Sequence, residues 1–461
     1  MHEKLKSNQK VCILFLLAAL LFFIPFYIYS QEKEPTKYFE LENGMKIFLY
    51  KRATLPLINL ALAVNVGSKD ETKENNGLVH ILEHYILFRG TKFRTGSEIS
   101  RDIRSHGAYF NAHTGRDLAV FEMSLPAEYA DFALQNQKEI LFNLKLSQQE
   151  LDNEKKIILE EISLLKDDPL KYATSLVYQN LFQGHPYQKP IYGRKEIIEA
   201  ATVEQLRTFY RNYFIPSNCS LAVVGDFSLK EMVKKVKHVF GSIENRKFTP
   251  YQLDKVKFLE KSVTIEKEMD VKQAYLVIGM VGPDYNNKDQ YTVNLLTHIL
   301  GRGINPMLNY PLRGRRNLAH SISMSFNALK YGGAILIFLT LDKKTIKFAK
   351  NETIKFLKMA RRQNYSKDDF LGEDRFYVFD FLESSKNQIR FALHHSQEKG
   401  LSVAASMARF MLLNEDQKRG KYLEVINKIN SSDLRKIAAK YLSQGKYVSV
   451  AIVPKKEKSK K

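Results

Sequence analysis

The sequence contains few cysteines for its length, with two among 461 residues. Cys12 lies in an apolar N-terminal run, so Cys219 is alone in the rest of the chain. An internal disulfide framework is therefore excluded, and the fold must be stabilised by packed cores. Cys219 belongs to the run NCSLAVV, which has the character of a β-strand, and we expect an unreactive, buried thiol.

Acidic residues are also scarce relative to basic ones. The chain has 50 Asp and Glu against 71 Lys and Arg, which gives a formal net charge of +21. The cations are spread along the chain and form no recognisable nucleic-acid motif, so we expect no nucleic-acid partner. A basic surface also suits acidic peptides or an anionic membrane. With 44% hydrophobic and 26% charged residues, the composition is that of a globular chain with two or three domains.

The N-terminus carries one long run without charge. Val11–Tyr29 is apolar and follows the basic segment MHEKLKSNQK. This pattern predicts a signal peptide or an N-terminal membrane anchor within residues 1–30. The positive flank stays on the cytoplasmic side. We therefore expect an exported protein that is periplasmic or otherwise extracytoplasmic, either secreted or held at the membrane through residues 11–29.

The remaining chain contains two copies of one pattern of elements. The stretch 262–285 resembles 45–70 in its two expected strands, and each is followed by a helix and then by a hairpin. This predicts an α+β fold with two homologous α/β-sandwich domains, each an antiparallel-rich sheet packed with helices. The predicted limits are residues 36–245 for the first domain, 246–265 for a linker, 266–455 for the second domain and 456–461 for a basic tail.

Local signals predict the elements of the first copy in more detail. The segment GSEISRDIRSHG is typical of a helix with Ser97 as its N-cap and Gly107 as its stop. The stretch 108–126 predicts a hairpin turned at TGRD. A long helical region with one break is expected over 127–165.

Three ionisable side chains interrupt the apolar segment GLVHILEHYILF, residues 77–88. At 100° per residue His80 and His84 share one face of a helix, and Glu83 lies three positions from His80. Two imidazoles at this spacing can hold a zinc ion, and the carboxylate can reach a water molecule beside it. The pattern H-x-x-E-H reverses the common order of zinc proteases. Taken alone, it also fits two buried, hydrogen-bonded histidines of a core.

A catalytic zinc usually has a third protein ligand, and the helical segment LDNEKKIILEEISLL offers one. Glu154 and Glu161 fall within about 20° of each other on this helix, at the centre of its apolar stripe. The stripe consists of Leu151, Ile157, Ile158, Ile162 and Leu165. Carboxylates that face a core need a metal or an imidazolium as partner. We expect Glu161 to be the third ligand and Glu154 to orient the ligand set, unless the helix is rotated and both side chains are solvated.

These motifs resemble those of the pitrilysin or insulinase-type zinc metallopeptidases, the inverzincins, in the two-repeat form of bacterial processing-peptidase-like chains. In that family a ligand Glu follows H-x-x-E-H after about 76 residues, with another Glu seven positions before it. The intervals from His84 to Glu161 and from Glu154 to Glu161 match this pattern. The flanking text NGLVHILEHYILFRGT and the strand YFNAHT are also similar. The likeness covers about residues 37–455.

The resemblance implies a clam-like pair of domains that close over a peptide. It implies one Zn²⁺ per chain, and an extended substrate that adds a strand to the sheet edge around Asn111 and Ala112. The helix of the second copy carries only His298, so we expect the zinc chemistry in the first domain alone.

The second copy departs from the family at its substrate-binding motif. LRGRRNLAHS keeps Arg313 at the place of the family's substrate-binding Arg, but His320 stands where a Tyr is usual and Asn317 where a Gly is usual. An imidazole still donates a hydrogen bond, with a different reach and pKa. The departure fits a homodimer, or a heterodimer with a related chain that supplies the Arg/Tyr contact, or an altered specificity. The segment also fits an exposed basic turn.

The sequence therefore predicts a zinc-dependent endopeptidase that hydrolyses peptides, unfolded chains or processing substrates. His80, His84 and Glu161 are the expected metal ligands, and Glu83 is the expected base. One alternative is a catalytically weak family member that acts as a peptide-binding or structural partner subunit. Another is a zinc-dependent chaperone at the membrane, for which Glu83 would be dispensable.

Overall fold

The computed structural model describes residues 36–247, 252–369, 379–413 and 422–455. Its first half is built on a six-stranded sheet. In spatial order the strands are β1 (Thr36–Glu40), β2 (Lys46–Lys51), β6 (Cys219–Gly225), β3 (Leu57–Val64), β5 (Ala119–Pro126) and β4 (Tyr109–Thr114). The helices of this half are α2 (Leu78–Phe88), α3 (Gly96–Ser105), α4 (Ala130–Phe142), α5 (Gln148–Asp167), α6 (Pro169–Leu181), α7 (Lys195–Ala200), α8 (Val203–Tyr213) and α9 (Leu229–Gly241).

The second half is built on a five-stranded sheet. Its strands, in spatial order, are β7 (Val263–Met269), β11 (Val448–Pro454), β8 (Ala274–Gly282), β10 (Gly332–Leu341) and β9 (Ser321–Leu329). Its helices are α10 (Asp289–Thr297), α11 (Ile346–Met359), α12 (Phe381–Glu398), α13 (Gly400–Leu413), α14 (Tyr422–Lys428) and α15 (Ser431–Ile437).

Apart from the additional edge strand β1, the two sheets have the same topology. The order β2-β6-β3-β5-β4 corresponds strand by strand to β7-β11-β8-β10-β9. In each sheet the first two strands of this order are parallel and the other neighbours are antiparallel. The predicted α+β class with two homologous domains is therefore confirmed. The predicted domain limits remain predictions.

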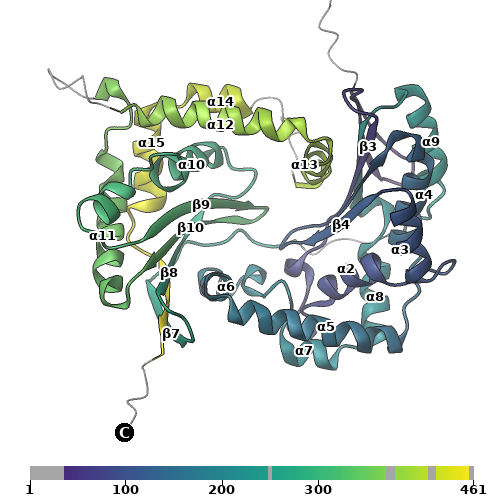
Figure 1. Cartoon of the computed structure of the whole chain (residues 1–461), viewed down its shortest axis with the longest axis horizontal. Coiled ribbons are helices and arrows are strands. Elements are labelled where there is room, and N and C mark those ends of the chain that lie inside the picture. The colour runs from purple at the N-terminus through teal and green to yellow at the C-terminus, as the bar shows by residue number, and fades with distance from the viewer. Residues whose placement is uncertain (1–35, 248–251, 370–378, 414–421, 456–461) are drawn as a thin grey trace, which may run out of the picture.

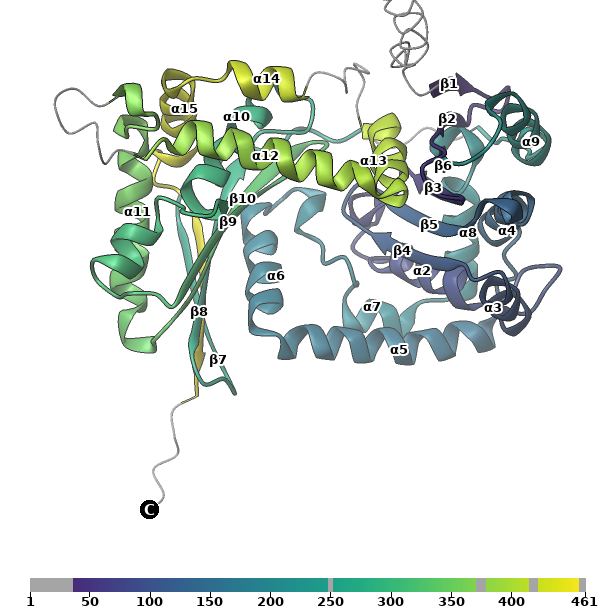
Figure 2. The same cartoon turned by 45° about the horizontal axis from the view of Figure 1, so that its top comes forward.

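One helix of each half covers the sheet of the other half (Figure 1, Figure 2). Apolar residues of α6, among them Ala173, Val177 and Leu181, form one core cluster with strands β8, β10 and β11. In return, Ala404 and Ala408 of α13 pack on β3 and β6. Because β3 is covered on both faces, its sequence LINLALAV is buried along nearly its whole length. The halves are thus interlocked by exchanged helices.

The local predictions had mixed outcomes. The hairpin at 108–126 and the break between α4 and α5 are confirmed. The N-cap prediction was wrong, because α3 is capped by Thr95 and not by Ser97. Thr95 and Glu98 form a reciprocal capping box, in which each accepts a hydrogen bond from the backbone N–H of the other. Cys219 is buried and free, as expected.

Several predictions fall on residues outside the described ranges. The expected signal peptide or anchor lies within residues 1–30, and the basic tail covers 456–461. Among the helices of the described ranges, none combines the length and the hydropathy that a membrane span requires.

Candidate metal and peptidase site

The helix that carries the histidine motif is buried on nearly all sides and begins in an unusual way. Gly77 precedes α2 with a left-handed φ of 113°, and no side chain caps the helix locally. Instead the buried Glu71 carboxylate accepts a hydrogen bond from the Val79 N–H at 2.9 Å and one from Asn76 Nδ2 at 2.6 Å. An acidic group at a helix N-terminus is favourable. Glu71 therefore fixes the start of α2 from outside the helix.

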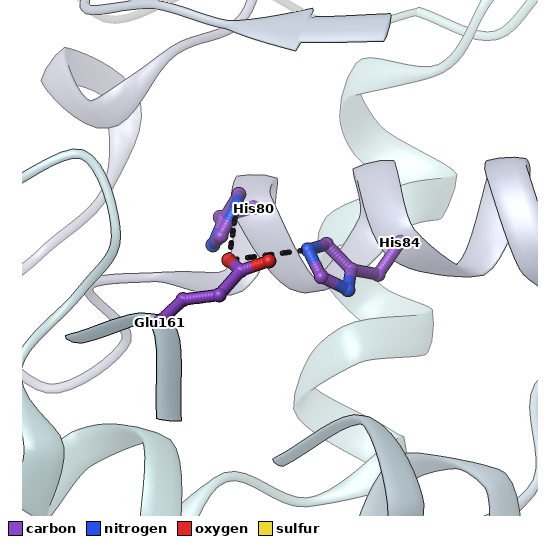
Figure 3. A group of neighbouring side chains, drawn as sticks. All are labelled: His80, His84 and Glu161. Atoms are coloured by element: carbon purple, nitrogen blue, oxygen red, sulfur yellow. Dashed lines mark ion pairs between the residues drawn. The ribbon is translucent and has the colours of Figure 1, made fainter. Parts of the chain in front are cut away.

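The structure brings His80, His84 and Glu161 together (Figure 3). Nε2 of His80 and Nε2 of His84 each lie 3.5 Å from Oε2 of Glu161. One potential ligand atom from each residue lies within 4.8 Å of the other two. Neighbouring ligands of a tetrahedral zinc with bonds of about 2.05 Å are about 3.3 Å apart, so this spacing suits zinc.

Glu154 holds the His84 ring in place. Its Oε2 lies 2.9 Å from His84 Nδ1, and its Oε1 accepts hydrogen bonds from the Arg89 guanidinium. A hydrogen bond to a carboxylate requires a proton on Nδ1, so in the neutral His84 ring the lone pair is on Nε2, which lies on the Glu161 side. Glu154 is completely buried, yet the partners His84 and Arg89 outweigh this burial and lower its pKa below the ordinary value.

The two histidines have opposite pKa shifts. Burial and the neighbouring His84 lower the pKa of His80 to about 3, so its imidazole is neutral. Burial also opposes the charged form of His84, but Glu154 and Glu161 outweigh it and raise the pKa of His84. In the described part of the chain, Nδ1 of His80 is buried without a hydrogen-bond partner. Two imidazole nitrogens and one carboxylate oxygen are a ligand set that zinc prefers, and few other groups form hydrogen bonds with these atoms.

Glu83 lies beside this set on the same helix. Burial raises its pKa, while the nearby Thr114, His84 and His113 side chains oppose the shift. The side chain is 9% exposed. A carboxylate with a raised pKa next to a metal site is suited to accept and return a proton near neutral pH.

Asn111 and Ala112 lie on β4, which is the edge strand of the first sheet. β4 pairs only with β5 among the described strands and packs against α2. β4 is therefore an edge strand, as the resemblance implied, and an edge strand of this kind can pair with an extended chain.

Arg313 and His320 are not brought to the metal-site residues. Arg313 is exposed and lines a cavity of about 770 Å³ that is formed by second-half residues alone, among them Met307, Phe356 and Phe381. His320 is exposed, and its Nε2 lies 3.3 Å from Oδ1 of Asp342. No described contact joins either residue to His80, His84 or Glu161. Their predicted role in substrate binding is therefore without support within one chain.

Sequence reasoning missed three residues that shape the site. Arg89 clamps Glu154, Glu71 caps α2, and the Tyr192 ring packs edge-on against the His80 ring with centroids 4.7 Å apart. Glu71 lies only eight residues before Val79, and an acidic residue near an uncapped helix start is a usable signal. The contact of Tyr192 joins segments far apart in the chain, and no local pattern indicates it.

Comparisons with known proteins identify a family and several similar chains. The family described as Insulinase (Peptidase family M16) matches residues 47–195, and the Peptidase M16 inactive domain matches residues 200–372. A protein named uncharacterized zinc protease from Rickettsia bellii is 26% identical over 421 residues, which covers 89% of this chain and 96% of that protein. The uncharacterized zinc protease YmxG of Bacillus subtilis is 25% identical over 401 residues, which covers 87% of this chain and 93% of that protein.

Solved structures show the same fold. A protease from Helicobacter pylori superposes with a TM-score of 0.83 at 21% identity, covering 91% of this chain and 100% of that one. A peptidase M16 inactive domain from Pseudomonas fluorescens gives a TM-score of 0.80 at 18% identity, with coverages of 92% and 98%. With both family models matched along one chain, and with relatives similar over nearly its full length, the chain belongs to the insulinase family of peptidases, M16, as its motifs predicted.

Proposed function

We propose that this chain is a zinc-dependent endopeptidase that cleaves extended or unfolded peptides. The observation that carries the proposal is the meeting of His80, His84 and Glu161, with Glu83 on the same helix. His80, His84 and Glu161 would hold one Zn²⁺. The zinc protease names of the relatives support the assignment. When bound, zinc polarises the scissile carbonyl and makes a water molecule more acidic.

The residues of the chain have separate tasks in this mechanism. The Glu83 carboxylate accepts a proton from the attacking water and returns it to the leaving amine. Glu154 and Arg89 keep the His84 ring oriented. The peptide lies extended along the open edge of β4, with Asn111 and Ala112 at its contact.

The test compares wild type with Glu83→Gln and His80→Ala. We expect Glu83→Gln to retain about one zinc per chain and to lose peptide hydrolysis, because only the proton acceptor is removed. His80→Ala should lose both zinc and hydrolysis. Metal analysis and cleavage of a quenched-fluorescence peptide pool, with and without a chelator, measure these outcomes. Hydrolysis by Glu83→Gln at the wild-type rate would contradict the role of Glu83.

A second candidate is a subunit that binds peptides but hydrolyses them poorly by itself. The positions of Arg313 and His320, away from the metal-site residues, favour this candidate. A second chain, identical or related, would then supply the missing contact in a dimer. Cleavage that rises steeply with protein concentration, or on addition of co-purifying proteins, supports it. Full activity from a monomer excludes it.

We also propose that the chain is exported, with residues 1–30 as a signal peptide or membrane anchor. The support is the uncharged run Val11–Tyr29 after a basic segment. Accessibility to an added protease in cells with a permeabilised outer layer and an intact inner membrane tests this proposal. Protection of the chain under those conditions would contradict it.

A further inference from the structure

A cavity of about 640 Å³ opens between the two halves, beside the metal site. It is bounded by α5, α6 and residues 190–196 of the first half, and by β9 and β10 of the second half. Tyr192 lines the cavity and also packs on His80, while Ile162 lines it and directly follows Glu161. A peptide held at the metal site would therefore place neighbouring side chains in this cavity.

The walls of the cavity are largely apolar and aromatic. The apolar lining residues are Ile162, Leu165, Leu170, Tyr172, Tyr178, Pro190, Ile191, Tyr192 and Phe338. Charged residues among the lining are mostly cationic, with Glu196 as the sole carboxylate among them. The cations are Arg116, Lys166, Lys171, Arg194 and Lys195. The cavity thus combines apolar area with an excess of positive charge.

Arg116 is the one cation of this set that the fold holds rigidly. It lies in the turn between β4 and β5, and its guanidinium stacks 3.7 Å above the Tyr178 ring. Its Nε donates a hydrogen bond to the Tyr187 carbonyl at 3.1 Å. Over the described ranges, no carboxylate pairs with it and nothing accepts a hydrogen bond from its terminal nitrogens. Burial lowers the pKa of Arg116, as expected for a guanidinium without a paired anion.

The nearest carboxylate is occupied elsewhere. Asp117 accepts hydrogen bonds from the Tyr187 hydroxyl at 2.5 Å and from the Lys330 backbone N–H at 2.9 Å. These bonds tie the β4–β5 turn to the β9–β10 turn and hold the two walls of the cavity together. Arg116 is consequently fixed in position with its terminal N–H groups available, and a planar guanidinium in this state is a receptor for a carboxylate.

We propose that this cavity is a substrate subsite in which Arg116 binds a peptide carboxylate and the apolar walls take a neighbouring apolar side chain. The inference rests on the proposed peptidase function and names its substrate class, which is acidic peptides with apolar residues. The carboxylate arrives either as an Asp or Glu side chain or as the free C-terminus of a short peptide. The surplus of cations at the cavity steers such substrates toward the site.

The test measures binding to zinc-loaded Glu83→Gln protein, so that hydrolysis is not required. The probes are a fluorescein-labelled peptide with one Glu among Leu and Tyr residues, its Gln counterpart, and both peptides with a C-terminal amide. We expect the carboxylate to improve affinity by about tenfold or more. Adding Arg116→Gln should bring the ratio of the affinities for the carboxylate-bearing and the uncharged peptide close to one. Arg116→Lys should retain part of the preference for the carboxylate. Lys237→Gln, an exposed change of the same charge on α9, should keep the ratio.

The outcomes separate the two sources of the carboxylate and the two proposals. Loss of affinity in the Gln peptide assigns the side chain, and loss in the amide assigns the C-terminus. A ratio near one before Arg116 is changed overturns the inference, and so does an unchanged ratio in Arg116→Gln. Equal weakening of all peptides by Arg116→Gln, with a lowered melting temperature, assigns a structural role and also overturns it. If the protein prefers the carboxylate-bearing peptides but wild type never hydrolyses a peptide, the subsite proposal stands and only the proposed peptidase function is contradicted.

Discussion

At the scale of residues, the surroundings of Glu154 and Glu83 shift the pKa values of these two glutamates in opposite directions. Glu154 has two cationic or imidazole partners, which lower its pKa despite complete burial. Glu83 has no comparably strong partner, and burial raises its pKa. Two carboxylates whose pKa values are shifted in opposite directions are suited to different roles. Glu154, as a permanent anion, is suited to orient a ligand, and Glu83 is suited to exchange a proton.

This difference predicts the effect of Glu154→Gln. The amide keeps the shape but removes the charge that fixes the His84 tautomer, so we expect zinc affinity to fall by about 10- to 100-fold. Competition with a chromogenic chelator measures the affinity. Glu160→Gln is the matched control, because Glu160 is exposed on the same helix. Equal affinities for Glu154→Gln and wild type would contradict the orienting role.

Within each helix, the sequence grouped the candidate site residues correctly because each pattern is local. His80 and His84 are one helical turn apart, and helical periodicity on α5 put Glu154 and Glu161 on one face. The same periodicity placed Ile157 in the stripe, yet Ile157 is 42% exposed, while Glu154 is buried. Helix rotation depends on what packs against the helix, and α5 turns its centre toward His84 and Arg89. Periodicity alone therefore put Glu154 and Glu161 on one face of α5 but did not give the degree of burial.

At the scale of elements, the position of α2 depends on a cap supplied from outside the helix. Glu71 accepts hydrogen bonds from Val79 N–H and Asn76, and the buried Lys189 donates to the Glu71 backbone carbonyl. This links the metal-site helix to the segment around residue 189. Capping rules search the residues next to a helix, and Thr95, the N-cap of α3, is a residue of that kind. Glu71 lies outside that search, eight residues before Val79, although an acidic residue near an uncapped helix start is a usable signal.

This cap predicts a pH dependence of stability. Burial raises the pKa of Glu71 from 4.5 to about 7. Because the folded-state pKa is the higher one, this group destabilises the fold progressively as pH rises from about 4.5 to about 7, by roughly 3 kcal/mol in total. Glu71→Gln cannot ionise. Its free energy of unfolding relative to wild type should therefore increase across this pH range and level off above it.

Urea unfolding of chelator-treated protein at a series of pH values measures this difference. Glu74→Gln is the control, since Glu74 is exposed in the same loop and its variant should give no comparable trend. A difference between Glu71→Gln and wild type that stays constant from pH 4.5 to 7 would contradict the raised pKa of Glu71.

At the scale of the whole molecule, the feature that the sequence concealed is the exchange of helices. The repeated order of strands predicted two homologous domains, and the two sheet topologies confirm it. The apolar face of α6 is an ordinary amphipathic pattern, and nothing in it tells which sheet it covers. In the fold, α6 packs on the second sheet and α13 on the first. Which surface an apolar face meets is decided by tertiary packing and not by periodicity.

The exchange predicts that neither half is stable alone. A fragment of residues 36–245 would expose the α6 face with Val177 and the faces of β3 and β6 that carry Ala61 and Val224. Such extended apolar surface favours loose packing or association. We expect this fragment to bind a hydrophobic dye and to unfold without a sharp transition, and to form a 1:1 complex when it is produced together with residues 252–455. Size-exclusion chromatography and dye fluorescence measure both outcomes. A monomeric fragment of residues 36–245 that unfolds cooperatively and binds no dye would contradict this prediction and show that the first half is stable without the helix it receives from the second half.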